Sequence, residues 1–394
     1  MPPGSAGPAP APGTPGGPLT VADVETAARG RLPADVWDFI EGGSRTEWTL
    51  AANRAQFGHW ALRPRVLVDV SDPDPSVELF GDRLAAPLAV APMAYHELAH
   101  EEGELATARA AAAEGVPLVV AAFAGRGLEE IATAAGGGAP LWLQLYWLGR
   151  KVVDELADRA AVAGYRALVV TADAPRVARR LRDVRNSFAP PPHIRAVNVD
   201  GAVPPVTAYR AAGASAIEAQ SRDRFDPSVT WADLARLRER TRLPVVLKGV
   251  LTAEDARLAV EHGCAAVIVS NHGGRQLDGA LPSLAALPEV AEAVAGRIPV
   301  LLDGGIRHGS DIAKALALGA QAVLVGRPVL WGLACAGAPG AAGVLRLLRE
   351  EFEEAMTLAG RPRATDFTRT AVTPWPPPTW SGAPGFGEAI PEGS

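Results

Sequence analysis

Apolar runs of strand length alternate with helical patterns along most of the chain, from about residue 86 onward. The runs are rich in Val, Leu, Ile and Ala, as expected for strands that are buried on both faces of a parallel sheet. Eight of them lie at residues 88–93, 117–123, 141–147, 167–173, 244–250, 265–271, 299–305 and 322–328. Helical patterns lie between them, for example at 102–114, 151–163, 231–241, 253–262 and 310–318. Eight strand and helix repeats predict an α/β protein with the fold of a (β/α)8 TIM barrel.

The segments outside this repeat indicate the domain organisation. Residues 1–18 consist mainly of Pro, Gly and Ala, which predicts a disordered tail. We expect one barrel domain over residues 19–365, beginning with a helical segment, and a C-terminal tail over residues 366–394. Residues 181–229 are a long insertion between the fourth strand and its helix, and we interpret them as a lid. The alternative is a surface loop or a subunit contact.

Composition and charge restrict the kind of protein. The 394 residues are 48% hydrophobic and 21% charged, which suits one large soluble domain. The net charge of -6 argues against a nucleic-acid partner, and no uninterrupted apolar run is long enough to cross a bilayer. The first 18 residues lack the features of a signal peptide, so we expect a cytoplasmic location. Cys264 and Cys335 are too few and too far apart for a disulfide framework or a metal site.

The segment SNHGGRQLDG at 270–279 carries the strongest sign of chemistry, because it follows directly on a predicted buried strand. His272 can take a proton near neutral pH, and the glycines let the backbone approach a ligand closely. Arg275 can grip a carboxylate with two parallel hydrogen bonds. The segment therefore predicts an enzyme that acts on a small acid.

Lys248 is unusual because the chain has only three lysines and this one lies inside an apolar strand. Burying an ammonium group is costly unless it meets an anion or a lone pair, so we predict a ligand contact. The alternative is a lysine whose stem packs in the core while its head reaches solvent.

Other polar residues also follow the predicted strands, at the end where barrel enzymes build their sites. They are Gln144, Tyr146, Thr171, Asp173, Asp303, Gly304, Gly305, Arg307, Gly326 and Arg327. Glycines and arginines after strands seven and eight, with a helix beginning near Ser310, predict a phosphate site. Ordinary turn glycines with surface arginines are the alternative.

Together these motifs resemble the FMN-dependent α-hydroxy-acid oxidases and dehydrogenases, which include glycolate oxidase, lactate oxidase and mandelate dehydrogenase. The resemblance extends from about residue 20 to residue 360. Its specific pieces are WTL at 48–50, NR at 53–54, APMA at 91–94, HEEGE at 100–104, QLY at 144–146, TADAPR at 171–176, RR at 179–180, LKGV at 247–250, SNHGGRQLDG at 270–279, DGGIR at 303–307 and GRP at 326–328.

The resemblance implies a role for each matching residue. His272 would receive a substrate proton while a hydride equivalent passes to FMN, and Asp173 would stabilise the imidazolium. Arg180 and Arg275 would hold the substrate carboxylate, and Tyr146 would donate a hydrogen bond to a substrate oxygen. The residues implied to bind FMN are Pro92, Met93, Ala94, Gln144, Thr171, Lys248, Ser270, Asp303, Gly304, Gly305, Arg307, Gly326 and Arg327. A homotetramer is implied as well.

Two departures from the family pattern point to the substrate. Phe39 stands where many members have a tyrosine that contacts the substrate carboxylate, and a flavin-side serine is replaced within residues 121–123. The resulting apolar pocket, with Phe39, Tyr95 and Phe123, favours an aryl (S)-2-hydroxy acid of the mandelate or 4-hydroxymandelate type. The pattern around Phe39 and residues 92–95 resembles hydroxymandelate oxidases. The resemblance also implies O2 as the acceptor, with H2O2 as product, because members with glycine in place of Ala94 often react poorly with oxygen.

Three alternatives remain open. The substrate could be aliphatic, such as L-lactate or glycolate. The same barrel and FMN could serve another chemistry, as in isopentenyl diphosphate isomerases or inosinate dehydrogenase-like proteins, although Cys264 and Cys335 are poorly placed for the nucleophile of the latter. A non-catalytic flavin-binding protein is the third, and the intact set of predicted catalytic residues disfavours it.

Overall fold

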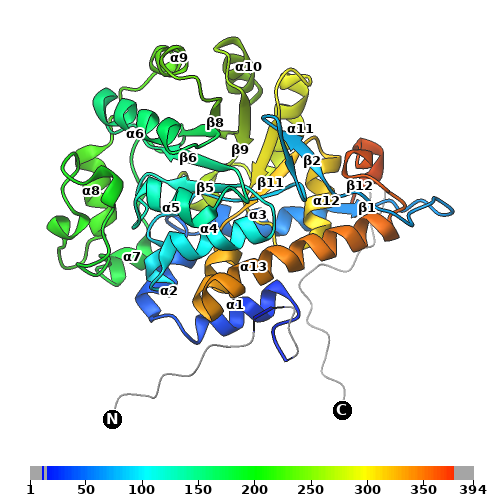
Figure 1. The fold of residues 1–394 in the computed structure, drawn as a ribbon, viewed down its shortest axis with the longest axis horizontal. Coiled ribbons are helices and arrows are strands. Elements are labelled where there is room, and N and C mark those ends of the chain that lie inside the picture. The colour runs from blue at the N-terminus through cyan, green and yellow to red at the C-terminus, as the bar shows by residue number, and fades with distance from the viewer. Residues whose placement is uncertain (1–10, 13–15, 377–394) are drawn as a thin grey trace.

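The computed structural model describes residues 11–12 and 16–376. The predicted tails, 1–18 and 366–394, therefore lie in large part outside the described residues. Among the described residues, eight parallel strands close into a barrel, which confirms the predicted (β/α)8 fold (Figure 1). The barrel strands are β4 (Leu88–Val90), β5 (Leu118–Ala121), β6 (Leu141–Leu145), β7 (Ala167–Thr171), β8 (Val245–Val250), β9 (Ala266–Val269), β10 (Val300–Asp303) and β11 (Ala322–Val325).

Strand pairing follows chain order around the ring, and β11 closes it by pairing with β4 through Val323 and Leu88. Each barrel strand is followed by a helix on the outside. These helices are α4 (Gly103–Ala113), α5 (Leu128–Ala135), α6 (Arg150–Val162), α9 (Trp231–Arg240), α10 (Ala253–Glu261), α11 (Ser283–Val294), α12 (Gly309–Ala317) and α13 (Arg327–Leu358). The five helices expected from the pattern are confirmed to within a residue or two.

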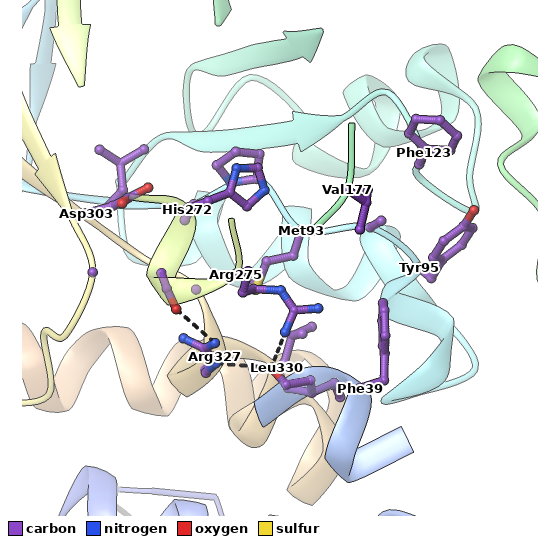
Figure 2. Close-up of a pocket in the computed structure, with 18 of the residues that line it drawn as sticks. Phe39, Met93, Tyr95, Phe123, Val177, His272, Arg275, Asp303, Arg327 and Leu330 are labelled. Carbon is purple, nitrogen blue, oxygen red and sulfur yellow. Dashed lines mark hydrogen bonds between the residues drawn. The ribbon is translucent and has the colours of Figure 1, made fainter. Parts of the chain in front are cut away.

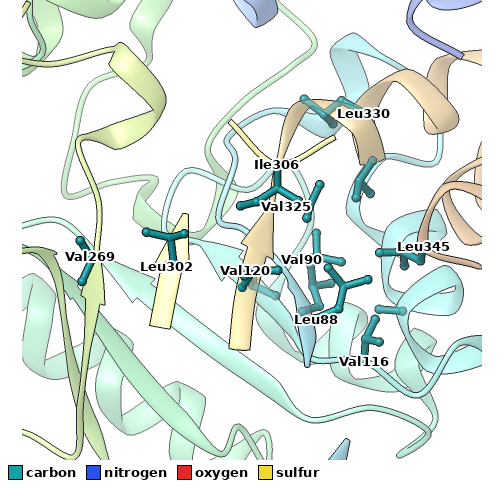
Figure 3. Packing of buried hydrophobic residues seen from close by; sticks show 14 of the residues in the cluster. Leu88, Val90, Val116, Val120, Val269, Leu302, Ile306, Val325, Leu330 and Leu345 are labelled. Atoms are coloured by element: carbon teal, nitrogen blue, oxygen red, sulfur yellow. The ribbon is translucent and has the colours of Figure 1, made fainter. Parts of the chain in front are cut away.

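Side chains fill the barrel interior, so the barrel is a packed core and not a pore. Trp142, Val169 and Ile268 point inward and are buried. A hairpin of β2 (Val77–Leu79) and β3 (Asp82–Leu84) closes the amino-terminal end, where Phe80 packs edge-on against Trp142 with ring centroids 5.3 Å apart. The alternate side chains of the strands form a second layer against the helices (Figure 3).

Helix α13 spans 32 residues, with a kink where the backbone of Ala336 and Gly337 is not helical, and it packs against α1 (Val21–Arg29), α4 and α12. It is the one helix among the described residues that is long and apolar enough to cross a membrane. Its sequence does not stand out as a strongly apolar run, because Ala and Gly fill much of the segment. Within its most apolar window 78% of the residues are buried inside the protein, as in the core helix of a soluble protein.

Two segments outside the barrel differ from expectation. The insertion contains α7 (Leu181–Arg185) and α8 (Ala216–Arg224) and is not a structureless loop. Part of the expected C-terminal tail belongs to the fold, because β12 (Val372–Pro374) pairs antiparallel with β1 (Trp60–Leu62). The helices α2 (Ala34–Glu41) and α3 (Trp48–Ala55) form the remaining N-terminal part.

Candidate active site

A cavity lies at the carboxyl ends of the barrel strands, between the barrel, α2 and the insertion (Figure 2). Most of the residues singled out from the sequence line it. They are Phe39, Pro92, Met93, Ala94, Tyr146, Arg180, Lys248, His272, Arg275, Asp303, Gly304, Gly305, Arg307, Gly326 and Arg327. The expected aromatic residues Tyr95 and Phe123 line it too.

Four of the singled-out residues, Asp173, Gln144, Thr171 and Ser270, are not on the cavity wall. Gln144 and Thr171 bond to each other, with Nε2 of the amide 2.8 Å from the hydroxyl, and the Gln144 carbonyl oxygen accepts the Ala122 N–H. These two side chains therefore stabilise the ends of β6 and β7, and their contact with FMN stays a prediction. Asp173 and Ser270 lie directly behind His272 and Lys248.

His272 sits in a tight turn after β9 with a positive φ of 61°. The Asn271 side chain accepts the Gly274 N–H and so stabilises this turn. His272 Nδ1 lies 3.0 Å from Asp173 Oδ1, and Nε2 lies 3.3 Å from the Tyr146 hydroxyl. Asp173 thereby fixes the tautomer with the proton on Nδ1 and leaves Nε2 as the basic nitrogen.

Burial and the positive charges of Lys248 and Arg180 lower the pKa of His272, although Asp173 opposes this shift. The imidazole is therefore neutral at neutral pH and can accept a proton. Burial would raise the pKa of Asp173, but its interactions with His272, including the hydrogen bond from the imidazole, and the charge of Lys248 outweigh burial and keep the pKa below the ordinary value, so the carboxylate stays ionised. The pair has the protonation states of a base and its supporting anion.

Lys248 is buried, and its Nζ lies 2.8 Å from Ser270 Oγ and 2.9 Å from Asp303 Oδ2. Burial alone would lower its pKa, but Asp303 and Asp173 raise it above the ordinary value. The alternative of a lysine head in solvent is thus wrong. The second oxygen of Asp303, Oδ1, is buried and has no hydrogen-bond partner in the part of the chain that the structure describes, so it can accept a hydrogen bond from a ligand.

Arg275, Arg307 and Arg327 bring an excess of positive charge into the cavity. Arg275 donates to the carbonyls of Ile40 and Gly42, and Arg327 donates to those of Ile40 and Gly273. Carbonyl groups carry no net charge, and among the described residues the one carboxylate within 4 Å of these three side chains is that of Glu41, 3.9 Å from Arg327. The charges of Arg275 and Arg307 therefore stay without a carboxylate partner. Burial and the neighbouring arginine charges lower the pKa of all three, that of Arg307 to about 10. Such a cluster selects anionic ligands.

One detail of the predicted phosphate site is wrong. The amide groups at the start of α12 are already used, because Arg307 N and His308 N donate to Asp311 and Gly309 N donates to Glu351. Ser310 does not line the cavity. The helix that begins at the cavity is α13, with Gly326 as its N-cap and Arg327 as its first residue.

Gly305 shows why this loop needs glycine. Its φ is +87°, and a β-carbon there would lie 2.3 Å from the carbonyl oxygen of Asn53. Arg54, which follows Asn53 in the sequence, donates hydrogen bonds to the Gly305 carbonyl and to the Asp311 carboxylate. The N-terminal segment therefore holds the loop after β10 in place.

Sequence reasoning missed the residues that the insertion contributes to the cavity. They are Ile217, Gln220, Ser221 and Phe225, and Val177, which lies just before the insertion, lines the cavity as well. The Phe225 ring centroid lies 4.7 Å from that of Tyr146 and 6.0 Å from that of Phe123. A lone aromatic residue after the polar helix α8 was the one available signal for Phe225.

A closed (β/α)8 barrel with a half-buried His–Asp pair and a strongly cationic cavity defines an enzyme for small anionic compounds. Comparison with known proteins identifies the family: the sequence profile of the FMN-dependent dehydrogenases matches residues 28–374. The chain belongs to this family, which confirms the predicted resemblance, the oxidoreductase class and the cofactor FMN.

Individual relatives are similar over nearly their whole length. The chain is 50% identical to 4-hydroxymandelate oxidase from Amycolatopsis orientalis, over 87% of this chain and 94% of that protein. It is 46% identical to L-lactate oxidase from Nostoc sp., with the same coverage. A crystal structure of mandelate oxidase with (S)-4-hydroxymandelic acid superposes with a TM-score of 0.87 at 47% identity, covering 91% of this chain and 99% of that one.

The cavity fits FMN on the chemistry of its own groups. Arg307, Arg327 and the start of α13 supply cations and a helix N-terminus suited to a phosphate. The free Oδ1 of Asp303 can accept a hydrogen bond from a ribityl hydroxyl. Lys248 offers a fixed positive charge, and the backbone at Pro92–Ala94 forms the facing wall.

Proposed function

We propose that the protein oxidises an aryl (S)-2-hydroxy acid, of the mandelate or 4-hydroxymandelate type, to the 2-oxo acid and passes the electrons to O2. The main support is the aromatic wall beside the arginines. Phe39 stacks on Phe188 at 4.6 Å between ring centroids, and the Arg275 guanidinium lies 5.3 Å from the centre of the Phe39 ring. Phe39, Tyr95 and Phe123 lie together on one side of the cavity, away from Asp303 (Figure 2). A phenyl ring beside a carboxylate matches this division of apolar and cationic surface.

Each catalytic residue has a role that its geometry supports. Arg180 and Arg275 bind the carboxylate and so orient the substrate carbon. His272 takes the substrate proton at Nε2, and Asp173 stabilises the imidazolium that forms. Tyr146, whose pKa is raised by burial, keeps its proton and donates a hydrogen bond to the substrate oxygen.

FMN, when bound, accepts the hydride equivalent from the substrate carbon. In total the hydroxy acid loses two electrons and two protons, and these reduce O2 to H2O2. Lys248 holds a positive charge at the cavity wall throughout. Residues of the insertion cover the cavity and exclude water from it.

Peroxide measurement tests the acceptor. Purified holoenzyme with excess (S)-mandelate in air should form one H2O2 for each 2-oxo acid. A turnover that requires an artificial acceptor and gives no H2O2 would contradict the oxidase proposal.

An aliphatic substrate is the second candidate, favoured by the 46% identity to an L-lactate oxidase. The ratio of kcat/KM for (S)-mandelate and L-lactate separates the two. The cytoplasmic location and the homotetramer also stay predictions, and sedimentation of the holoenzyme tests the latter.

A further inference from the structure

We infer that Gln220, in the insertion helix α8, selects a ring that carries a 4-hydroxyl group by accepting its hydrogen bond. The inference rests on the proposed function and specifies which aryl acid the site prefers. It starts from a polar side chain that no step of the oxidation uses.

Gln220 is a buried amide, 4% exposed, that lies between two cavities. It lines the cavity of the candidate active site and also a smaller one formed by residues such as Ile194, Val199 and Pro204. Its Nε2 donates to the Pro204 carbonyl at 2.8 Å. Because a carbonyl can only accept, this bond fixes which way the amide points.

The amide oxygen of Gln220 is left with no hydrogen-bond partner among residues 11–12 and 16–376. Its neighbours on this wall cannot supply one, since Val177, Ile217 and Phe225 contribute apolar side chains. The Ser221 hydroxyl is already used, because it accepts the Val177 N–H and donates to the Glu218 carbonyl. The amide oxygen of Gln220 is therefore an acceptor that can bind a hydrogen-bond donor on the ligand.

The proposed orientation of the substrate places the outer end of its aryl ring against the cavity wall that α8 forms. The carboxylate is held at Arg180 and Arg275, and the reacting carbon lies at His272. The Asp303 side of the cavity is the proposed cofactor side, so the ring extends toward the aromatic side chains and α8. The atom at position 4 lies farthest from the reacting carbon, and a phenol there is a hydrogen-bond donor.

Hydrogen bonding then separates two substrates that differ by one oxygen atom. An unsubstituted ring that displaces water would leave the amide oxygen buried without a partner, which costs about 10-fold to 100-fold in kcat/KM. (S)-4-Hydroxymandelate should therefore exceed (S)-mandelate by about this factor in the wild-type enzyme.

The test compares kcat/KM for the two acids in the wild-type holoenzyme and in Gln220→Met, which keeps the length of the side chain and removes the acceptor. We expect the ratio in favour of the 4-hydroxy acid to fall to near one. Arg222→Gln, on the same helix with its side chain exposed, is the matched control and should keep the wild-type ratio. An unchanged ratio in Gln220→Met overturns the inference.

Two further measurements separate the role of Gln220 from that of Tyr95 and from any effect of the substitution on folding. Tyr95→Phe removes a second hydroxyl group that lines the cavity, and loss of the ratio there instead of in Gln220→Met would assign the selection to Tyr95. The wild-type enzyme with (S)-4-fluoromandelate needs no variant: fluorine cannot donate, so equal kcat/KM for the fluoro and hydroxy acids contradicts the inference. A wild-type enzyme that oxidises lactate and neither aryl acid contradicts the proposed function as well, whereas mandelate oxidation without 4-hydroxyl selection contradicts only the role of Gln220.

Discussion

At the scale of single residues, charge placement around His272 decides whether it can act as a base. Its pKa is lowered by burial and by the cations Lys248 and Arg180, and Asp173 partly reverses the shift. The acid limb of kcat/KM should therefore lie below the ordinary histidine value of 6.5, since only the neutral ring accepts a proton.

Replacing Asp173 by Asn tests this arrangement. The amide removes the charge that raises the His272 pKa, so the acid limb of the pH profile should move to lower pH. It also removes the anion that stabilises the imidazolium, so kcat should fall by roughly 100-fold to 10,000-fold. A pH series of kcat/KM measures both effects. An acid limb that stays in place or moves to higher pH would exclude the proposed coupling.

The functional residues at the strand ends could be predicted from the sequence, because the prediction needs only the residues that end or follow each apolar run. His272, Lys248 and Arg327 each follow or end an apolar run, and the barrel topology brings such positions together. Gln220 could not be predicted in this way. Its position depends on how α8 folds back over the barrel, and the sequence of α8 has no apolar face that fixes this.

At the scale of elements, the helix at the phosphate site shows which signal was overlooked. Helix α12 comes after the segment Gly305-Ile306-Arg307, whereas α13 begins at Arg327, directly after Gly326. The prediction named only the helix near Ser310, which is α12. Asp311 lies three residues after His308, which is the spacing of a capping box, and its carboxylate takes the amides of α12. Helix α13 has no capping box of this kind. It begins at Arg327 and has Pro328 in its first turn, and proline at that position is typical of a helix start.

The insertion is the element that should set substrate affinity. Phe225→Ala removes a ring that contacts Tyr146 and Phe123 and opens the cavity to water. We expect KM for (S)-mandelate to rise by roughly 10-fold, with a smaller change in kcat. Val197→Ala, an exposed change in the same insertion outside the cavity, is the control. Equal KM values in the two variants would refute a lid role for α8.

At the scale of the whole molecule, the eight repeats predicted the barrel because each strand is a local apolar run. Contacts between distant segments were not predictable in this way. The pairing of β1 with β12 joins segments that are far apart in the sequence. Each strand has only three residues, which is too short for an alternation of apolar and polar residues to predict it. The same holds for the packing of α1 against α13.

The half-buried arginines of the cavity should make the stability of the whole protein depend on FMN. Burial, and after it repulsion from neighbouring arginines, lowers the pKa of Arg275, Arg307 and Arg327, so their charged forms are costly unless an anion lies beside them. Removing FMN should lower Tm by roughly 5 °C, and inorganic phosphate should restore part of the loss. Chloride at equal ionic strength is the control for screening. An apoprotein that is as stable as the holoenzyme, or that responds equally to both salts, would contradict this expectation.

Anaerobic reduction of the bound flavin tests the central claim most directly. The holoenzyme is mixed without oxygen with (S)-mandelate, (S)-4-hydroxymandelate or L-lactate while flavin absorbance is followed, and air is then admitted. We predict rapid bleaching by both aryl acids, slower bleaching by L-lactate and recovery of absorbance in air. Faster bleaching by L-lactate, or no bleaching by any of the three acids, would contradict the claim that this is an oxidase of aryl 2-hydroxy acids.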